Sequence, residues 1–390
     1  MKIVHVCLAN FFIDNYSYQE NMLPKYHKRM GHDVAVVASL VDFDENGKIC
    51  FRDGAKRYEN EYGIPVTRLA YRNQGALSRA LRLRRYVGTS EAIEREQPDI
   101  LFIHGCQFTD MDLVVKYLKD HPNVKVYVDN HADFSNSARN FLSRNVLHRF
   151  LWKRSATMIE PYTKNFYGVL PARVEFLKNV YGLPSEKVEL LVMGADDEAV
   201  SLSAEPEVRK RIRKQYGIED GDFVIMTGGK IDAFKTQTLL LMQAVKRLNR
   251  ENVKLIVFGS VIPEMKQQVD VLCDGKKIQY IGWVQAKDTY DLFSAADLVV
   301  FPGRHSVFWE QVCGQGIPML CKKWDGTTHV DVGGNVIFLT EDSEDEIHSA
   351  IEDLLDHPET YDRMKKAAMD FGMKHFSYQD IAKRSIETEE

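Results

Sequence analysis

The feature that most constrains the fold is a regular alternation of short apolar runs with amphipathic stretches. The chain opens with the apolar run KIVHVCLA, continues through a polar loop and the stretch NMLPKYHKRMG, and reaches a second apolar run, HDVAVVAS. A strand, a crossover helix and a second strand in this order predict parallel pairing. The order continues with IPVTRLA, the basic stretch SRALRLRRYVGTSEAIERE expected to be one helix, PDILFIHG and VKVYVDNH. The first half therefore predicts a doubly wound parallel α/β sheet.

The same alternation starts again after residue 200. The polar helix EVRKRIRKQYG precedes the strand DFVIMTGG, a helix and the strand NVKLIVFG, and further strands are expected at IQYIGWV, DLVVFPG and IPMLCK. Between the halves, GADDEAVSLSAEPE is polar and has no apolar period, which predicts a junction. The predicted domains are residues 1–198 and 199–374, followed by a helix over 375–390 that returns to the first domain. Two such sheets facing each other would place their ligand-binding carboxyl ends on one cleft.

Composition and charge exclude several classes of protein. The 390 residues carry a net charge of -5, which argues against a general nucleic-acid binder. The apolar runs are all shorter than the ~20 residues that cross a bilayer. The six cysteines form no C-x-x-C pair, which predicts reduced thiols in a cytoplasmic protein rather than disulfides or a zinc site. Only Lys2 precedes the apolar N-terminus, so a first strand is favoured over a signal sequence.

The strongest motif is TGGKIDAFKTQ. A predicted strand ends in Gly228 and Gly229, Lys230 and Lys235 follow, and a helix is expected to begin around Thr236. Free N–H groups at a helix N-terminus and two ammonium groups are well suited to a diphosphate. The pattern is not a P-loop, because G-x-x-x-x-G-K-[ST] is absent. Two solvated surface lysines would give the same sequence, and the motif alone fits both interpretations equally.

A second motif, FPGRHSVFWEQ, places a carboxylate at the start of a helix that follows a strand. Glu310 in this position can accept hydrogen bonds from a vicinal diol, as the acidic residue of a dinucleotide-binding fold does with ribose. A glutamate that only stabilises the helix N-terminus is the commoner case. Both this motif and the glycine–lysine turn lie at strand ends of the same half, which favours a binding site.

Histidines end two predicted strands of the first half. His131 follows VYVDN directly, with Asp129 and Asp133 beside it, and His104 ends LFIH. A histidine at a strand end can act as an acid or base or bind a sugar hydroxyl. It can also only hydrogen-bond the backbone, and this alternative is the stronger one for His104. The sequence contains no group of residues with convincing metal-ligand spacing.

Two segments of the first half interleave basic and apolar residues. They are RNFLSRNVLHRFLWKRSA, over 139–156, and the shorter SRALRLRRYV, over 78–87. A basic amphipathic helix can lie on an anionic membrane surface, or it can be a core helix with a basic solvent face. The second interpretation is slightly favoured by the sequence.

Taken in order, these motifs resemble the retaining glycosyltransferases of family four, which have the GT-B fold. GGKIDAFK is similar to the family segment whose basic pair grips the donor diphosphate, and AADLVVFPG with WEQVCGQGIPML is similar to the block whose final glutamate binds the nucleotide ribose. YIGWV is similar to the loop that cradles the base through its backbone. LVMGADDE, KRMGHDVAVVAS and the last helix, YQDIAKRSIE, also resemble family segments.

The chain departs from the family pattern at two places. The family has a second glutamate eight positions before the ribose-binding one, where this chain has Pro302, and no acidic residue lies between Pro302 and Glu310. Either His305 or Ser306 takes over its contact with the donor sugar, or the sugar is held differently. The usual glycine pair of the first loop is missing, and DNYSYQEN stands in its place.

The resemblance implies a transferase that moves a sugar from a nucleotide-sugar to a glycan, a lipid-linked intermediate or a small molecule. It implies retention of configuration, no cofactor and no metal, and a role such as polysaccharide biosynthesis, with contact to the inner face of an anionic membrane as a further expectation. A non-catalytic nucleotide-sugar-binding subunit and a sugar-nucleotide 2-epimerase are the alternatives. The site residues it implies are His131, Lys230 and Lys235 for catalysis; Gly228, Gly229, Lys230, Lys235, Gly282, Trp283, Val284, His305, Ser306, Val307, Phe308 and Glu310 for the donor; and Asn15, Tyr16, His104 and Asp133 on the acceptor side.

Overall fold

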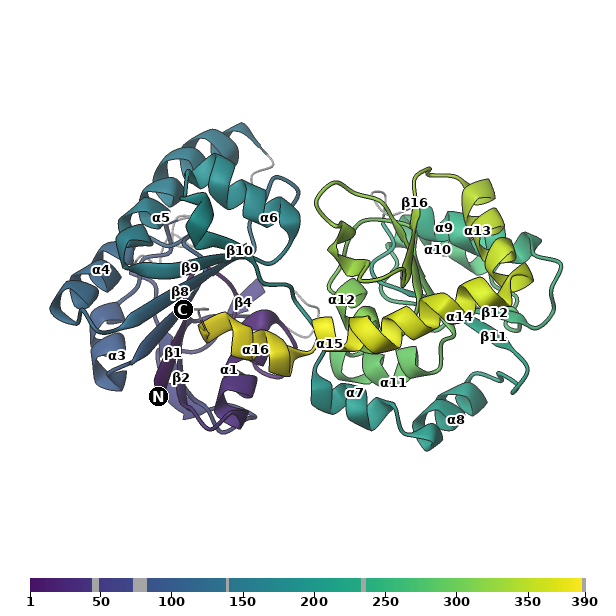
Figure 1. The fold of residues 1–390 in the computed structure, drawn as a ribbon, viewed down its shortest axis with the longest axis horizontal. Coiled ribbons are helices and arrows are strands. Elements are labelled where there is room, and N and C mark those ends of the chain that lie inside the picture. Colours follow the sequence, from purple (N-terminus) through teal and green to yellow (C-terminus); the bar gives the residue numbers. More distant parts are fainter. Residues whose placement is uncertain (44–48, 73–82, 138–139, 233–235, 388–390) are drawn as a thin grey trace. The chain divides into compact units, whose positions relative to one another are not determined.

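The described chain folds into two compact units (Figure 1). The computed structural model describes residues 1–43, 49–72, 83–137, 140–232 and 236–387. The first unit consists of Met1–Val192 together with Ile381–Glu390, and the second unit consists of Met193–Asp380. Their division falls a few residues before the boundary expected from the sequence. Helix α16 (Tyr378–Ile386) begins in the second unit and ends in the first.

The first unit is built on an eight-stranded sheet, as far as the described residues show. Its order is β10-β9-β8-β7-β1-β2-β6-β5, and its neighbours are parallel except for β5, which is antiparallel to β6. β1 and β7 read as continuous apolar runs because both faces of a parallel sheet are covered. The strands are β1 (Lys2–Cys7), β2 (Asp33–Ser39), β5 (Arg57–Glu59), β6 (Pro65–Leu69), β7 (Ile100–His104), β8 (Lys125–Asn130), β9 (Thr163–Gly168) and β10 (Val188–Leu190), with a separate ribbon of β3 (Val41–Phe43) and β4 (Ile49–Phe51).

Helices cover both faces of this sheet. Figure 1 shows α3, α4 and α5 on one face and α1 with the end of α16 on the other. The predicted basic helix over 139–156 is present within 140–156, as a π-helix that continues into an α-helix. The helical segments are α1 (Gln19–Arg29), α3 (Thr89–Glu96), α4 (Met111–Asp120), the π-helix η1 (Leu142–Trp152), α5 (Lys153–Ile159), η2 (Glu160–Tyr162), α6 (Pro171–Phe176), η3 (Leu177–Tyr181) and η4 (Ser185–Lys187).

One predicted helix of the first half is wrong in its described part. SRALRLRRYVGTSEAIERE was expected to be continuous, but Tyr86 pairs with Tyr71 as an isolated bridge, and α3 begins only at Thr89. The buried Asp110 carboxylate accepts hydrogen bonds from the Tyr86 backbone N–H and from Thr89 Oγ1, at 2.9 and 2.6 Å. Gly88, with φ +86°, makes the turn between them. The first part of the stretch, up to residue 82, lies outside the described residues.

The second unit contains an all-parallel sheet of six described strands. Their order is β13-β12-β11-β14-β15-β16, and the apolar runs expected from the sequence supply all of them except β16. The strands are β11 (Phe223–Gly228), β12 (Val253–Phe258), β13 (Ile278–Tyr280), β14 (Leu298–Phe301), β15 (Met319–Lys322) and β16 (Val336–Leu339). The helical segments are α7 (Asp197–Ser203), α8 (Pro206–Gln215), α9 (Gln237–Arg247), α10 (Pro263–Leu272), η5 (Ala286–Asp288), α11 (Thr289–Ser294), α12 (Phe308–Gly314), η6 (Thr328–Val330), α13 (Glu344–Asp356), α14 (Pro358–Ala367), η7 (Ala368–Gly372) and α15 (Met373–His375).

The junction segment is more ordered than its composition suggested. GADDEAVSLSAEPE contains the helix α7, although it shows no apolar period. Asp196 caps this helix, because its side chain accepts a hydrogen bond from the Glu198 backbone N–H at 3.3 Å. A capping residue before a short, mostly exposed helix was the signal that the periodicity argument missed.

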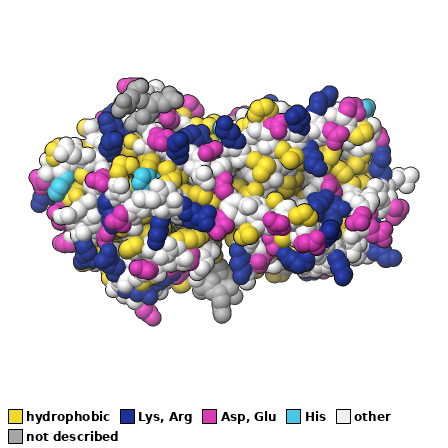
Figure 2. Space-filling model, turned by 60° about the horizontal axis from the view of Figure 1, so that its bottom comes forward, with side chains coloured by type: hydrophobic (Ala, Val, Ile, Leu, Met, Phe, Trp, Pro, Cys, Tyr) yellow, Lys and Arg dark blue, Asp and Glu magenta, His cyan; other side chains and the backbone are white. Residues whose placement is uncertain are grey.

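The surface mixes charges of both signs. Basic and acidic side chains are interspersed over the face drawn in Figure 2, which fits the small net charge. All six cysteines are free, and Cys7, Cys106, Cys313 and Cys321 are buried. Within the described residues, no helix has both the length and the apolar character needed to cross a membrane.

Candidate functional site

Three neighbouring strands of the second unit end in glycines whose backbones touch. Gly228 is the last residue of β11 and is followed by Gly229, while Gly259 follows β12 and Gly282 follows β13. The Gly229 N–H donates to the carbonyl of Phe258 at 3.0 Å, and the Gly259 N–H donates to the carbonyl of Gly282 at 2.7 Å. The carboxyl ends of the three strands thus form one continuous backbone surface, the glycine surface, made of Gly228, Gly229, Gly259 and Gly282.

Side chains are excluded from this surface by geometry. A Cβ on Gly259 would lie 1.9 Å from the Gly229 carbonyl oxygen, and φ is +122° at Gly259 and +136° at Gly229. Only glycine adopts such backbone angles at low cost. A ligand can therefore approach the peptide groups closely, as a diphosphate does at the end of a parallel strand.

The predicted diphosphate lysines lie beside this surface in the sequence. Lys230 follows Gly229, its side chain is 56% exposed, and its ammonium group is 3.4 Å from the Asp232 carboxylate. Lys235 lies outside the described residues, and its role stays a prediction. Helix α9 begins at Gln237, so the N-terminal N–H groups of the helix follow the turn as the sequence predicted.

The loop predicted to hold the base leaves its strand earlier than expected. β13 ends at Tyr280, so Gly282, Trp283 and Val284 lie in a loop rather than in a strand. Gly282 has φ +81°, and the Trp283 side chain is 68% exposed. An exposed indole beside a bare backbone offers a flat apolar surface for stacking as well as backbone hydrogen bonds.

Glu310 is a fully buried carboxylate in the first turn of α12. Its Oε1 accepts hydrogen bonds from His305 Nε2 at 2.7 Å and from His329 Nε2 at 2.8 Å. Burial alone would raise the pKa of Glu310, but the two histidines outweigh it and hold the pKa well below its usual range. The glutamate is therefore ionised, and the two histidines provide its hydrogen bonds.

The second oxygen of Glu310 has no partner among the described residues. Oε2 is buried, and so are the unpartnered Nδ1 of His329 and Nε1 of Trp309. An unpaired buried oxygen on a carboxylate is costly, and a sugar hydroxyl could satisfy it. Glu310 has no exposed surface, so a ribose reaches it only if a neighbouring side chain moves aside; of its two histidine partners, His305 is the more exposed, at 13% against 3% for His329.

The other residues that the sequence predicted in the shortened loop are Ser306, Val307 and Phe308, which precede Glu310 in the chain. Ser306 accepts a backbone hydrogen bond from Trp309 at 3.0 Å, and Val307 is 45% exposed at the N-cap of α12. Phe308 packs against Phe258 and Phe293, with ring centroids 5.7 and 5.6 Å away. Phe258 is the residue whose ring also lies against Gly228, so the loop and the glycine surface share one packing partner.

His329 was missed by the sequence interpretation. It lies in η6, after β15, and is 19 residues from Glu310, a separation that carries no recognisable spacing. The available signal was its place in the chain, since it follows a strand of the same half. The same signal had selected His131 in the first half.

His305, Glu310 and His329 are also the described residues that could together hold a metal ion. Ligands of a tetrahedral ion with bonds of 2.0–2.1 Å stand about 3.3 Å apart, and neighbouring ligands of an octahedral ion about 2.9 Å apart. The histidine nitrogens lie 2.7 and 2.8 Å from the glutamate oxygen. These distances are those of hydrogen bonds, and both histidines need their Nε2 protons to make them.

In the first unit, His131 lies next to a second buried carboxylate. Its Nε2 is 3.5 Å from Asp129 Oδ2 and 3.8 Å from Glu20 Oε1, and its side chain is 19% exposed. Burial alone would lower the pKa of His131, but Glu20 and Asp129 outweigh it and raise the pKa above its ordinary value. An exposed edge and a raised pKa suit a histidine that gives or takes a proton near neutral pH. Glu20, on α1, was not identified from the sequence.

Two residues predicted on the acceptor side are engaged inside the unit. His104 is fully buried, and its Nδ1 lies 2.7 Å from Asp129 Oδ2, so it contacts Asp129 rather than an acceptor. Asp133 Oδ1 accepts hydrogen bonds from Ser135 and Asn136, and Oδ2 lies 3.1 Å from Arg173 Nε. Both side chains are buried and have internal partners in this structure, and their acceptor role stays a prediction.

Asn15 and Tyr16 remain accessible in the loop after β1. Asn15 is exposed and has φ +63°, a backbone angle that asparagine tolerates better than most residues. It thus supplies the left-handed turn for which the resembling family uses glycine. Tyr16 packs against Tyr18 and Phe43, with ring centroids 5.2 and 5.9 Å away.

The family model "Glycosyl transferases group 1" matches residues 208–371, the part of the chain that carries the glycine surface and Glu310. Residues 208–371 form a glycosyl transferases group 1 domain. Two curated proteins are similar to this chain at low sequence identity. An uncharacterized glycosyltransferase of Methanocaldococcus jannaschii is 25% identical over 134 residues, 33% of this chain and 34% of that protein. The mannosylfructose-phosphate synthase of Agrobacterium fabrum is 22% identical over 262 residues, 63% of this chain and 55% of that protein.

Solved structures of low sequence identity extend the likeness to the whole fold. Sucrose-phosphate synthase of Thermosynechococcus elongatus has a TM-score of 0.66 at 14% identity, covering 98% of this chain and 96% of its own. HepE of Anabaena, solved with UDP, has a TM-score of 0.64 at 15% identity, with 98% of both chains covered. The UDP-GlcNAc 2-epimerase of Neisseria meningitidis also matches, with a TM-score of 0.61 at 14% identity and 98% of both chains covered. The fold is GT-B, and fold alone does not separate transferases from epimerases.

The glycine surface of the group 1 domain predicts the effect of one added methyl group. Gly259→Ala would force the Gly229 carbonyl away and strain a backbone with φ +122°. We expect a loss of about 3 kcal/mol in the free energy of unfolding, measured by urea denaturation. Gly221→Ala is the control, because nothing lies within 4 Å of its added Cβ. Equal stability of the two variants would contradict the close approach of the strand ends.

Proposed function

We propose that the protein is a nucleotide-sugar-dependent glycosyltransferase. The observation that carries this proposal is the coincidence of the group 1 match with the glycine surface and the buried Glu310. The acceptor is a glycan, a lipid-linked intermediate or a small molecule. The two curated relatives are named as a glycosyltransferase and a sugar-phosphate synthase, which supports sugar transfer as the class of reaction.

The donor binds on the second unit in this proposal. The diphosphate lies on the Gly228–Gly229 turn at the start of α9, with Lys230 and Lys235 neutralising its charge. The base lies against the loop of Gly282, Trp283 and Val284. HepE, a protein of the same fold, was solved with UDP, so a uridine nucleotide is the first donor to test.

Glu310 holds the ribose through its unpartnered Oε2. Its Oε1 stays bonded to His329, and His305 moves to open the way and contacts the donor sugar with Ser306, Val307 and Phe308. A ribose hydroxyl would donate to the buried carboxylate, a charge-assisted hydrogen bond of the stronger kind. This would satisfy the oxygen of Glu310 that has no partner among the described residues.

Transfer proceeds with retention of configuration and without a metal ion. Negative charge develops on the departing diphosphate, and the backbone N–H groups and the ammonium groups of the two lysines would stabilise it. His131 of the first unit contacts the donor sugar or the acceptor, and its raised pKa lets it carry a proton at neutral pH. Asn15 and Tyr16 are the accessible candidates for acceptor contact.

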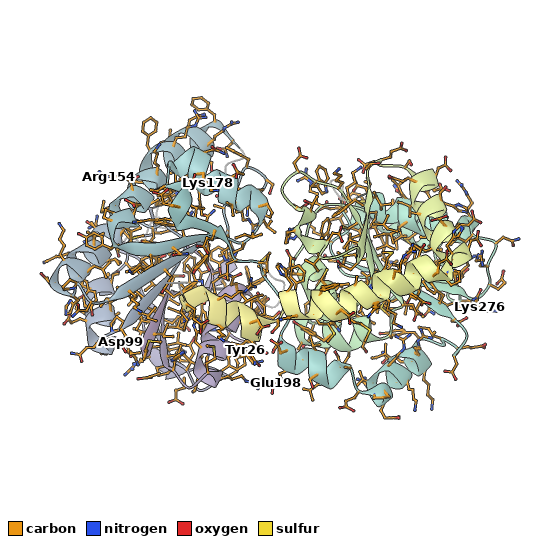
Figure 3. All side chains as sticks on the ribbon, in the orientation of Figure 1. Tyr26, Asp99, Arg154, Lys178, Glu198 and Lys276 are labelled. Carbon is orange, nitrogen blue, oxygen red and sulfur yellow. The ribbon has the colours of Figure 1, made fainter. Side chains whose placement is uncertain are left out.

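We also propose that the first unit contacts an anionic membrane through η1. Phe141, Val146 and Phe150 are 80%, 44% and 72% exposed. Residues four or five apart share a face of a π-helix, whose hydrogen bonds run from residue i to i+5, so the three side chains form one apolar stripe. Basic side chains flank it, and Figure 3 shows Arg154 and Lys178 on the same side of this unit. The exposed flanking residues are Arg144, Arg149, Lys153 and Arg154.

Two alternatives make different predictions about turnover. A sugar-nucleotide 2-epimerase, which shares the fold, would convert a donor without any acceptor. A non-catalytic subunit would bind a donor tightly and turn over none across an acceptor panel. Incubation with donor alone, followed by NMR, distinguishes the first from a transferase, and the acceptor panel distinguishes the second.

The diphosphate proposal predicts a strong effect of the two lysines. Lys235→Ala should lower transfer by about 10²-fold or more, and Lys230→Ala by a smaller factor, because each removes charge stabilisation of the leaving group. A thermal-shift screen with UDP-, GDP-, ADP- and CMP-sugars first identifies the donor, which raises the apparent stability of the native protein. Lys246→Ala, in the last turn of α9, is the control. Unchanged turnover in Lys235→Ala, with the fold intact, would overturn the assignment.

Metal independence gives a second prediction. Because Glu310 is compensated by hydrogen bonds from His305 and His329 without an ion, a chelator should leave transfer unchanged within about two-fold. The measurement is the initial rate of transfer before and after treatment with EDTA. A loss of activity that a divalent cation restores would show that the histidine–glutamate group holds a metal.

The membrane proposal predicts selective vesicle binding. The full chain should sediment with vesicles of anionic phosphatidylglycerol and not with neutral phosphatidylcholine. Replacing both Phe141 and Phe150 by Ser should weaken binding about tenfold or more, because two exposed rings leave the lipid. Leu202→Ser, which changes a 64% exposed side chain on α7 of the second unit, should have no effect. Equal binding of both variants would exclude η1 as the contact.

A further inference from the structure

Three buried histidines form a row behind the His131 site. His27 Nδ1 lies 3.0 Å from His5 Nε2, and His5 Nδ1 lies 3.0 Å from His104 Nε2. His104 Nδ1 lies 2.7 Å from Asp129 Oδ2, and that oxygen is 3.5 Å from His131. His5, His27, His104 and Asp129 are each 0% exposed. None of the three histidines has a role in the transfer proposed above.

The row is fixed by secondary structure. β1, β7 and β8 are adjacent in the sheet, and His104 and Asp129 stand opposite each other in register. His5 and His104 stack with ring centroids 5.3 Å apart, and His5 and His27 with centroids 5.1 Å apart. Four different elements thus supply one continuous hydrogen-bonded line.

The far end of the row meets the C-terminal helix α16. His27 Nε2 lies 2.9 Å from the Ala382 carbonyl and 3.1 Å from Ser385 Oγ. Ser385 donates its own hydroxyl to the same carbonyl at 2.8 Å. His27 Nε2 therefore faces two acceptors and has to carry a proton. Figure 3 labels the neighbouring residue Tyr26, on α1 next to α16.

The contact of His27 with α16 determines which nitrogen of each histidine in the row carries a proton. Burial lowers the pKa of His27 to about 3 and that of His5 well below its ordinary value, so both rings are neutral. A neutral imidazole has one donor and one acceptor nitrogen. With its proton on Nε2, His27 accepts from His5 Nε2, and His5 accepts from His104 Nε2. Each of the three histidines therefore donates from its Nε2 towards α16.

At the end of the row next to Asp129, His104 then carries one proton more than a neutral imidazole. His104 donates from Nε2 to His5, and its Nδ1 faces Asp129, which as a carboxylate only accepts. Burial would raise the pKa of Asp129, but His104 and His131 outweigh it and hold it below its usual range. His104 has to be an imidazolium beside an ionised Asp129, and the pair as a whole has no net charge.

We propose that His27, His5 and His104 are positioning residues that link the docking of α16 to the charge beside His131. While the Ala382 carbonyl is in place, the His104–Asp129 pair is neutral. Without it, His27 Nε2 is free to lose its proton, the row reverses, and Asp129 is left with uncompensated charge. This inference rests on the proposed role of His131, but its measurement does not require transfer activity.

The other charges around His131 stay constant in this comparison. Glu20 on α1 raises its pKa, and Arg173 on α6 lowers it, while Asp133 is paired with Arg173. None of these groups belongs to the row. A change made at His27 therefore reaches His131 through His104 and Asp129.

The test is the titration of His131, followed by NMR in the full chain labelled at histidine. His27→Phe keeps a ring of similar size and removes both nitrogens, so His5 is free to donate to His104, which becomes neutral. We expect the midpoint of His131 to rise by about one pH unit, since a nearby uncompensated carboxylate favours the imidazolium. His27→Gln can donate to Ala382 and accept from His5, and should restore the wild-type midpoint.

Tyr127→Phe is the matched control. It removes the hydrogen bond from Tyr127 to the Ile386 carbonyl, 3.0 Å long, which also holds α16 to the first unit. It should lower stability without moving the midpoint of His131. If His27→Phe folds and titrates like wild type, or if Tyr127→Phe gives the same shift, the row is packing only and the proposal fails.

The wild-type spectrum gives an answer that does not depend on any variant folding. At neutral pH the ¹⁵N shifts should show both nitrogens of His104 protonated, with His5 and His27 neutral and protonated at Nε2. A neutral His104, or a proton on Nδ1 of His27, would overturn the proposal. Where transfer is measurable, the pH profile of His27→Phe should move in the same direction as the His131 midpoint. Absence of transfer would count against the proposed function and leave this result standing.

Discussion

A carboxylate that stays ionised inside a protein needs compensating partners, and each unit is organised around one such group. In the first unit Asp129 lies against His104 and His131, and in the second Glu310 lies against His305 and His329. In both units two histidines outweigh the cost of burial and keep the carboxyl pKa low. Moving one of these histidines away would leave a buried charge without one of its compensating partners.

Each of the two carboxylates keeps one buried oxygen without a partner among the described residues, Glu310 Oε2 and Asp129 Oδ1, and the two groups differ in what surrounds them. Glu310 keeps a buried, unpartnered Oε2 beside a strand-end surface made of glycine backbone. Asp129 instead stands between a partly exposed histidine and a buried row that continues to the chain's last helix. The first arrangement suits a group that holds a polar ligand, and the second suits a group that controls a proton.

The sequence predicted the sheets well because parallel strands buried on both faces carry a strong local signal, as in HDVAVVAS and NVKLIVFG. It also identified His131 and Glu310 from their places at strand ends, while their roles stay proposals. It could not identify His329, Glu20 or the partnership of His5 with His27, because these contacts join elements far apart in the chain and follow no spacing. For the same reason it could not show that His104 and Asp133, predicted on the acceptor side, are buried and have internal partners.

The contribution of the last helix to the first unit has a consequence for biosynthesis. Residues from Ile381 onward belong to the first unit, and Ala382 and Ser385 supply the partners of His27. Domains generally fold in the order in which a ribosome makes them. Here the unit made first lacks this element until the second unit has been translated, so the second unit is synthesised before the buried histidine row has both of its ends.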